Sequence, residues 1–462
     1  MTSGHDNFSR FLDFREEYPW LSFDSYQYHF TGKSLEIRFI FNLSDRIHFS
    51  PKISFPYKEK IFPVPGNWTA EALDNLVFHM GMIELISYWK AACPAEVIIK
   101  PHGLEPGQIN FWKKIYFHGL GEFFHKNSIR TGLEDFMSIS SEESNPVKPF
   151  YPGPLQGGIV PVGGGKDSAV TLGLLNKFDI DWIPFVINPR TATQEVIRAA
   201  AKSDPDTIVA HREIDPELLR LNSEGFLNGH TPFSALLAFY SLLAAYLSGR
   251  SEIILSNESS ANEPTIPGTT INHQYSKSIG FERDFRQYYH KYISPEFDYF
   301  SLLRPLSELQ IAGIFSGMPR FFNSFKSCNA GSKSDAWCGN CPKCLFTFII
   351  LSPFIEPSRL EGIFGKNLLD EPLLKETLAE LTGMTASKPF DCIGTTEEVR
   401  MALAGAVKYY QDRPLPYLLS LPSSRNILDQ YDKREIPQIM ANLGHEHFIP
   451  EKYLHLLDSM IS

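Results

Sequence analysis

The sequence predicts an α/β protein built on a doubly wound parallel sheet. Apolar runs with strand character alternate with longer runs of helical spacing between residues 157 and 325, a pattern typical of parallel strands with helices on both faces. A glycine-rich turn joins the first strand to the first helix, as in many nucleotide-binding sheets. The expected strands span 159–162, 182–187, 207–210 and 253–255, and the expected helices span 168–177, 193–202 and 233–247.

Residues 1–150 are expected to form a separate N-terminal α+β domain. Residues 35–41 alternate at their start and indicate a strand. Residues 70–90 predict a helix that begins near Thr69, and residues 111–126 predict a second helix, interrupted at Gly119 and Gly121. A polar, turn-rich linker is expected over 138–146.

Three further units are expected after this linker: a nucleotide-binding domain over residues 151–325, a four-cysteine metal knuckle over 326–350 and a helical region over 351–462. The chain has 462 residues, 43% of them hydrophobic, which fits a globular protein with ample core. Its formal net charge of −10 argues against nucleic acid as a partner. Nothing in the pattern indicates an oligomeric state.

Two segments bear on membranes and localisation. The first 20 residues are rich in charge and contain no apolar signal region, so a cytoplasmic protein is expected. The uncharged run over 231–249 includes one proline and three serines, and a strand-like run follows it. It therefore predicts a buried helix of the α/β domain and no membrane insertion.

The turn after the first parallel strand has the chemistry of a phosphate site. Glycines have no Cβ, so the backbone can turn its N–H groups toward an anion at the start of a helix. A lysine supplies positive charge there, and a serine supplies a hydroxyl. The spacing differs from that of a Walker loop. We expect these residues to bind the pyrophosphate part of ATP: Gly163, Gly164, Gly165, Lys166, Asp167 and Ser168.

Polar side chains follow two other predicted strands at the same edge of the sheet. Asn188 and Ser256 are expected to contact adenosine, because ligands of such sheets bind beyond the carboxyl ends of the strands. Asp167 and Glu258 are expected to bind Mg²⁺, since carboxylates and phosphate oxygens are its usual ligands. A turn or capping role is the alternative for the segment around Ser256.

Four of the six cysteines lie close together in the sequence, with spacing C-x9-C-x2-C-x2-C. Clustering of this kind favours a metal over disulfides in a cytoplasmic protein. Four thiolates favour a closed, structural zinc site, with an iron–sulfur cluster as the metal alternative. The predicted ligands are Cys328, Cys338, Cys341 and Cys344.

Several polar segments are candidates for contacts with a substrate. Asn272, His273, Tyr275 and Lys277 belong to a run of six polar residues, which is either a solvated loop or a substrate clamp. In the second case Lys277 suits a carboxylate or phosphate, and His273 and Tyr275 suit proton transfer. His230 lies in a similar polar loop.

Three further features leave alternatives open. Arg304 could face an anion, and Ser307 is expected to cap the helix that follows it. Lys90 and Glu122 form either a buried salt bridge or part of a site. Cys392 is either a buried structural cysteine or a reactive thiol near a helix start, where a capping box with Glu398 is expected.

The glycine loop resembles the Ser-Gly-Gly-x-Asp-Ser signature of the PP-loop ATP pyrophosphatases (the HUP type of fold), with Gly163 where that family usually has serine. The cysteine spacing resembles that of PP-loop enzymes that make deazaguanine nitriles. Taken together, the motifs resemble the ATP-dependent UDP-N-acetyl-α-D-muramoyl-L-alanyl-L-glutamate epimerases of peptidoglycan synthesis. This likeness extends from about residue 87 to residue 398 and rests on residues 87–94, 117–123, 162–168, 228–230, 272–278, 304–308, 338–344 and 392–395.

The resemblance implies inversion of the terminal L-glutamate of UDP-MurNAc-L-Ala-L-Glu to D-glutamate, with release of AMP and pyrophosphate. Removing a proton beside a carboxylate would place two negative charges on one small enolate. An acyl-adenylate removes one of these charges, which explains the need for ATP and Mg²⁺. The implied partner is therefore a small nucleotide-sugar dipeptide.

The catalytic candidates are Lys166, Asp167, His273, Lys277 and Cys392. The two acid/base residues that invert the α-carbon stay open among His230, Glu258, His273, Tyr275, Lys277 and Cys392. One alternative function is a PP-loop synthetase that adenylates a carboxylate or nucleobase for nitrogen or sulfur transfer. The other is a nucleotide sensor without catalytic activity.

Overall fold

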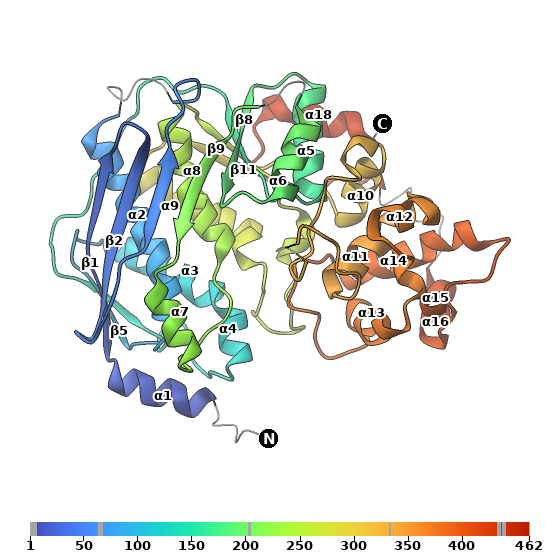
Figure 1. Ribbon diagram of the computed structural model, residues 1–462, viewed down its shortest axis with the longest axis horizontal. Coiled ribbons are helices and arrows are strands. Elements are labelled where there is room, and N and C mark those ends of the chain that lie inside the picture. Colours follow the sequence, from blue (N-terminus) through green and yellow to red (C-terminus); the bar gives the residue numbers. More distant parts are fainter. Residues whose placement is uncertain are drawn as a thin grey trace.

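The computed structural model describes residues 7–62, 68–201, 205–331, 334–431, 436 and 440–461. Its centre is one mixed sheet of 11 strands with the order β11-β10-β7-β8-β9-β4-β2-β1-β5-β6, and β3 pairs with β2 (Figure 1). The strands are β1 Trp20–Phe30, β2 Ser34–Leu43, β3 Ile47–Phe49, β4 Lys52–Pro56, β5 Glu96–Ile99, β6 Ser138–Ser141, β7 Gly158–Pro161, β8 Trp182–Ile187, β9 Ile208–Glu213, β10 Glu252–Leu255 and β11 Asp298–Ser301.

Helices cover both faces of the sheet and form most of the C-terminal part. They are α1 Asn7–Glu17, α2 Ala70–Trp89, α3 Pro106–Gly119, α4 Gly121–Lys126, α5 Lys166–Lys177, α6 Thr191–Ala200, α7 Pro216–Ser223, α8 Phe233–Leu247, α9 Ile279–Tyr292, α10 Glu308–Ser316, α11 Pro342–Leu351, α12 Pro357–Phe364, α13 Lys375–Leu381, α14 Thr396–Ala406, α15 Tyr417–Ser420, α16 Pro422–Gln430 and α18 Glu451–Ile461. The helices α11 to α16 gather at one end of the molecule, beyond α5 and α10 (Figure 1).

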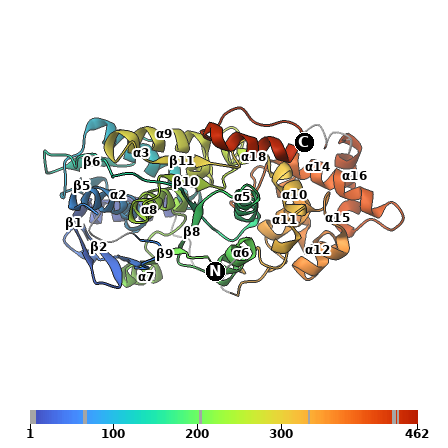
Figure 2. The ribbon, with the colours of Figure 1, turned by 90° about the horizontal axis from the view of Figure 1, so that it is seen from above.

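The parallel part of the sheet confirms the predicted alternation of strands and helices. The strands β7 to β11 pair in parallel in the order β11-β10-β7-β8-β9. The order reverses between β7 and β10, which creates a crevice at their carboxyl ends. On either side of these strands lie α8 and the pair α5 and α6 (Figure 2). This architecture directs the glycine loop after β7 and the segment after β10 to one place.

The antiparallel part of the sheet continues directly from the parallel part. The strand β4 pairs with β9, and β2 and β1 continue the sheet toward β5 and β6. Residues 1–150 and 151–325 therefore contribute strands to one sheet. The division of the chain into domains at residue 150 stays a prediction. The expected linker over 138–146 was wrong at its start, because Ser138–Ser141 forms the edge strand β6.

Local sequence signals account for most helix boundaries. Thr69 caps α2 by accepting a hydrogen bond from the Ala72 amide. The expected helix over 111–126 breaks at Leu120 into α3 and α4, and it begins earlier, at Pro106, where the fixed φ of proline suits a first helical position. Ser307 and Thr395 form the capping boxes of α10 and α14. The predicted end of α6 at Lys202 lies outside the described residues.

The long apolar helices are buried inside the protein. Every residue of α2 from Leu76 to Trp89 is buried, and α8 packs against α2 beneath the sheet. The run over 231–249 therefore forms the internal helix that was predicted. No helix in the described parts of the chain combines the length and the apolar character needed to cross a bilayer.

A buried ion pair joins α2 to the end of β9. Glu84 is fully buried, and its carboxylate accepts two hydrogen bonds from the Arg212 guanidinium at 2.5 and 2.7 Å. The Tyr240 hydroxyl of α8 donates to the same carboxylate at 2.9 Å. Because the Arg212 backbone also exchanges hydrogen bonds with the Asn188 side chain of the β8–α6 segment, this residue helps to hold the carboxyl edge of the sheet.

We predict that Glu84→Ala lowers the free energy of unfolding by about 3 kcal/mol, because it leaves the Arg212 charge buried without its partner. The measurement is urea unfolding followed by circular dichroism. Glu17→Ala, which removes an exposed pair with Arg46, is the control and should change the unfolding midpoint little. Equal midpoints for the two variants would contradict a structural role for the Glu84–Arg212 pair.

Candidate functional site

The glycine loop lies at the switch point of the sheet, between β7 and α5. Gly164 has a φ of +85°, and a Cβ built on it would lie 3.1 Å from the Thr193 backbone nitrogen, so glycine is required there. At Gly163, by contrast, the nearest atom to a built Cβ is 3.9 Å away. Gly165 is the N-cap residue of α5 and supplies no side-chain cap, which leaves the first amides of the helix available to an anion.

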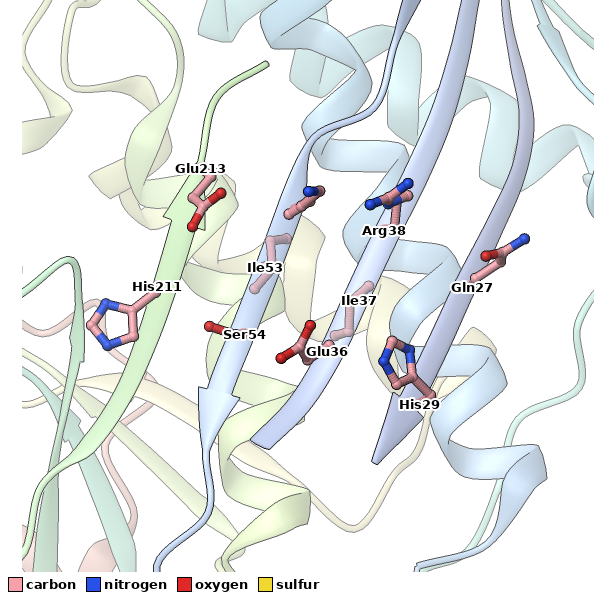
Figure 3. A pocket seen from close by; sticks show the side chains of 10 residues that line it. Gln27, His29, Glu36, Ile37, Arg38, Ile53, Ser54, His211 and Glu213 are labelled. Atoms are coloured by element: carbon pink, nitrogen blue, oxygen red, sulfur yellow. The ribbon is translucent and has the colours of Figure 1, made fainter. Parts of the chain in front are cut away.

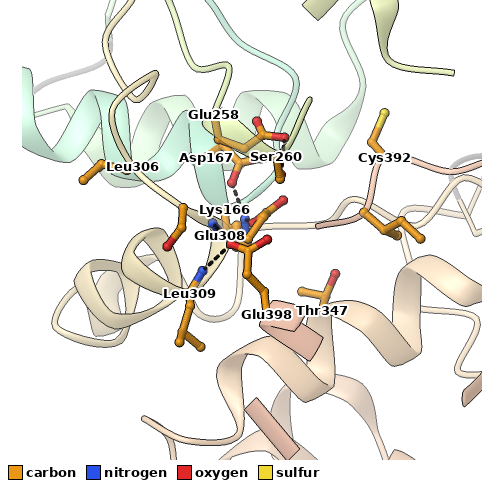
Figure 4. A network of polar contacts seen from close by, with 12 residues as sticks. Lys166, Asp167, Glu258, Ser260, Leu306, Glu308, Leu309, Thr347, Cys392 and Glu398 are labelled. Atoms are coloured by element: carbon orange, nitrogen blue, oxygen red, sulfur yellow. Dashed lines mark hydrogen bonds and ion pairs between the residues drawn. The ribbon is translucent and has the colours of Figure 1, made fainter. Parts of the chain in front are cut away.

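The lysine of the loop forms a buried cluster with carboxylates. Lys166 is 5% exposed, and its ammonium contacts both Asp167 and Glu308 (Figure 4). Burial disfavours the charged lysine, but the two carboxylates outweigh this effect and raise the pKa of Lys166. Burial raises the pKa of Glu308 above its ordinary value. The cluster thus holds charge in a poorly solvated place.

Three carboxylates meet at this cluster. One oxygen from each of Asp167, Glu258 and Glu308 lies within 4.8 Å of the other two. Asp167 and Glu258 were the predicted Mg²⁺ ligands, and Glu308 had been missed as a ligand. Glu308 is the first residue of α10, and its amide donates to Glu398 of α14 at 2.6 Å. Converging carboxylates fit a hard divalent cation such as Mg²⁺.

The two residues predicted to contact adenosine lie in different surroundings. The Ser256 hydroxyl is buried after β10 and has no hydrogen-bond partner among the described residues. Asn188 is exposed, has a φ of +48°, and binds the Arg212 backbone through both ends of its amide. Ser256 therefore has free hydrogen-bonding capacity at the crevice, whereas the Asn188 side chain is already hydrogen-bonded to the Arg212 backbone.

A second cluster surrounds Cys392, which is partly buried. The Lys277 ammonium lies 3.1 Å from the Cys392 sulfur. Burial alone would raise the pKa of the Cys392 thiol, but Lys277, a hydrogen bond from His273 and the charge of Lys343 together lower it to about 6. These neighbours favour the thiolate of Cys392, as a reactive thiol would require.

Glu122 of α4 holds the histidine beside Cys392. Its carboxylate lies 2.5 Å from Nδ1 of His273 and 3.4 Å from Nδ1 of His230. Burial opposes the charged imidazole, but Cys392 and Glu122 raise the pKa of His273 to about 9. Lys90 donates instead to the Gly229 carbonyl and to the Thr231 hydroxyl, so of the two alternatives the structure does not form the Lys90–Glu122 salt bridge.

The other predicted substrate contacts lie around this cluster. The Tyr275 hydroxyl has no hydrogen-bond partner among described residues, and its ring lies 4.9 Å from that of His118. Asn272 donates to the Ala261 carbonyl at 2.8 Å and shapes its own loop. We expected Arg304 to face a substrate anion, but it is 2% exposed and pairs with Glu282 at 2.8 Å, so its charge is used inside the fold.

Arg304 also connects the two clusters. Its guanidinium donates to the Glu258 carbonyl at 2.7 Å and to the Lys277 carbonyl at 2.6 Å. The Cys392 segment approaches the carboxylates as well, because a Cβ built on Gly394 would lie 3.2 Å from Cβ of Glu308. The carboxylate cluster around Lys166 and the thiolate cluster around Cys392 are therefore neighbours in one site.

The four cysteines of the knuckle converge as predicted. The sulfurs of Cys328, Cys338, Cys341 and Cys344 all lie within 4.8 Å of one another. Two of these pairs, Cys328 with Cys341 and Cys338 with Cys344, are 3.7 Å apart. A zinc ion with bonds of about 2.3 Å to four sulfurs would set them about 3.8 Å apart. The donor set and its size fit a tetrahedral thiolate site.

Two hollows were not anticipated from the sequence. One, of about 590 Å³, lies between α3, α4 and residues 269–271, and His118 and Gly121 line it beside the Glu122 cluster. The other, of about 390 Å³, lies on the open face of β1, β2, β4 and β9, where charged side chains of neighbouring strands alternate in sign (Figure 3). It contains none of the predicted site residues. An exposed antiparallel face of this kind is ordinary.

Two family models and several known proteins match most of this chain. Residues 14–302 match the family model described as MurL N-terminal domain, and residues 324–425 match that described as MurL C-terminal domain. Three relatives are each named UDP-N-acetyl-alpha-D-muramoyl-L-alanyl-L-glutamate epimerase. That of Salinispora tropica is 34% identical over 76% of this chain and 78% of its own. Those of Xanthomonas oryzae pv. oryzae and Micromonospora sp. are each 33% identical, over 83% and 77% of this chain and 86% and 80% of their own.

We predict that the purified protein contains one zinc ion per chain and that Cys344→Ser loses it, because three thiolates leave the tetrahedral site open. Elemental analysis measures the metal. Cys392→Ser, which removes a cysteine outside the knuckle, should retain it. Protein without metal, or with iron and labile sulfide, would contradict the zinc assignment.

We predict that alkylation of Cys392 by iodoacetamide accelerates as pH rises through about 6 and then levels off, because the thiolate reacts and the thiol does not. Peptide mass spectrometry follows the modification at Cys392. Lys277→Met should move the midpoint to higher pH, and Lys277→Arg should keep it near that of the wild type. A wild-type midpoint near the ordinary value of about 8.5 would count against the cluster.

Proposed function

The chain belongs to the MurL family, and from this membership we propose that it inverts the terminal L-glutamate of UDP-MurNAc-L-Ala-L-Glu to D-glutamate in an ATP-dependent reaction. The observation that carries the proposal is the contact between two chemically different clusters, one suited to phosphates and one suited to proton transfer. Because the reaction consumes ATP, the cytoplasm is the expected compartment.

The first step is adenylation of the substrate carboxylate. The strand order β11-β10-β7-β8-β9 supports assigning the parallel part of the sheet to the PP-loop ATP pyrophosphatase (HUP) type. Residues 163–168 would bind the pyrophosphate through backbone amides at the start of α5, and Ser256 would contact the nucleoside with its free hydroxyl. The carboxylate attacks the α-phosphorus, and pyrophosphate leaves toward Lys166.

Mg²⁺ would neutralise the phosphate charge and orient the leaving pyrophosphate. Asp167, Glu258 and Glu308 would hold it, since their oxygens already converge. The ammonium of Lys166 lies against two of these carboxylates. It is therefore placed to contact the pyrophosphate next to the metal.

The second step is proton transfer at the α-carbon. The acyl-adenylate removes the carboxylate charge, so a thiolate can take the α-proton and leave an enolate with a single charge. Cys392 is that base, and His273 and Lys277 are charged donors beside it. Inversion requires a donor on the opposite face of the carbon, and these two cations are the candidates. Water then releases AMP and the D-glutamate product.

Glu122 would position this second cluster. Its hydrogen bond to Nδ1 of His273 would hold the ring beside Cys392. The hollow beside α4, with a volume of about 590 Å³, would receive the sugar-nucleotide end of the substrate, because His118 lines it and packs against Tyr275. The substrate glutamate would then reach the thiolate from that side.

The two steps should separate in variants. With ATP, Mg²⁺ and UDP-MurNAc-L-Ala-L-Glu, the wild type should form the D-glutamate product, AMP and pyrophosphate. Lys166→Met should lose pyrophosphate release. Cys392→Ser should retain exchange of labelled pyrophosphate into ATP but lose inversion by about 100-fold or more, because a serine hydroxyl is a far weaker base. Chiral analysis of the released glutamate measures inversion.

Other products would contradict the proposal. AMP formed only when ammonia or a sulfur donor is added would indicate a synthetase, and binding of ATP without AMP would indicate a sensor. Cys392→Ser with wild-type inversion would remove Cys392 from the proton transfer. Lys277→Arg, which keeps the charge beside Cys392, is the matched control.

A further inference from the structure

Lys343 lies where the cysteine knuckle meets the site. It stands between Cys341 and Cys344, in the first turn of α11, and is 9% exposed. Its ammonium donates to the Cys392 carbonyl and lies 5.4 Å from the centre of the Phe346 ring. A residue of the knuckle thus contacts the backbone of the proposed base.

The Lys343 ammonium is not paired with a carboxylate among the described residues. Within the described parts of the chain, no carboxylate lies within 4.0 Å of its ammonium, whereas Lys166 contacts two. A buried ammonium bound only to one carbonyl is unfavourable unless an anion completes its surroundings. Gly394, two residues beyond Cys392, lies beside Glu308, so the Cys392 carbonyl that Lys343 binds stands between the two clusters.

An anion at this position would lie between the metal-binding carboxylates and the proton-transfer residues. In the proposed reaction that place belongs to the α-phosphate, because the phosphate tail is held at residues 163–168 and the substrate carboxylate must reach Cys392. The pyrophosphate cannot be the partner as well, since Lys166 and the start of α5 serve it. Lys343 is therefore a buried cation placed to meet the transferred group.

We propose that Lys343 binds the α-phosphate of ATP and of the acyl phosphate anhydride formed from it, and that the metal knuckle holds Lys343 in place. This inference rests on the proposed function. In the step concerned, a carboxylate oxygen forms a bond to the α-phosphorus, and the bond between that phosphorus and the bridging oxygen breaks. Lys343 balances the charge on the non-bridging oxygens. The knuckle then has a part in catalysis although it has no open metal position.

The test compares Lys343→Met with Lys343→Arg, using zinc content, exchange of labelled pyrophosphate into ATP, and AMP-forming turnover. Lys343→Met should keep zinc and lose exchange by about 100-fold, as expected when one charged donor to a reacting group is removed. Lys343→Arg should recover most of the exchange. Lys366→Met is the matched control, because Lys366 also contacts the knuckle beside Gly339 but pairs with Glu371 at the surface.

Three outcomes would overturn the inference. The first is wild-type exchange in Lys343→Met with zinc retained. The second is loss of zinc from both Lys343→Met and Lys343→Gln but not from Lys343→Arg, which would mean that the charge stabilises the knuckle alone. The third is a rise in the KM for the dipeptide substrate with an unchanged KM for ATP, which would assign Lys343 to the substrate carboxylate. Absence of exchange in the wild type would instead refute the proposed function itself.

Discussion

The site depends on the balance of charge around Lys166. Three carboxylates, those of Asp167, Glu258 and Glu308, converge on the switch point of the sheet with one buried ammonium among them. Fully ionised, this group carries excess negative charge in a poorly solvated place, and the raised pKa of Glu308 reflects that strain. A divalent cation relieves it. The strands β7 and β10 and the helices α5 and α10 therefore meet around the place where we propose that a metal and phosphates bind.

Charge balance also governs the thiolate cluster around Cys392, which lies beside the carboxylates. A thiolate at Cys392 is stabilised by Lys277 and His273, and the carboxylate of Glu122 stabilises the charged imidazole in turn. Arg304, itself neutralised by Glu282, fixes the backbone of both clusters. The proposed activation of a carboxylate and proton transfer at the neighbouring carbon need a separation of only a few atoms, and this shared support is consistent with that need.

Features encoded in short segments could be predicted from the sequence. The glycine loop, the cysteine knuckle and the caps at Ser307 and Thr395 depend on neighbours a few residues away. Features that depend on packing could not. Glu308 lies 50 residues beyond Glu258, and only the meeting of α10 with the loop makes it part of the carboxylate group. Likewise, the sequence alone does not indicate that Glu282 neutralises the charge of Arg304. The residues of β4 and β9 also contain no pattern that predicts their pairing.

A crystal structure with Mg²⁺ and a non-hydrolysable ATP analogue tests the central claim most directly. The account predicts the β- and γ-phosphates on the amides of residues 163–168, the metal among Asp167, Glu258 and Glu308, and the α-phosphate on the side facing Cys392. A nucleotide bound elsewhere, with this carboxylate group empty, would contradict it.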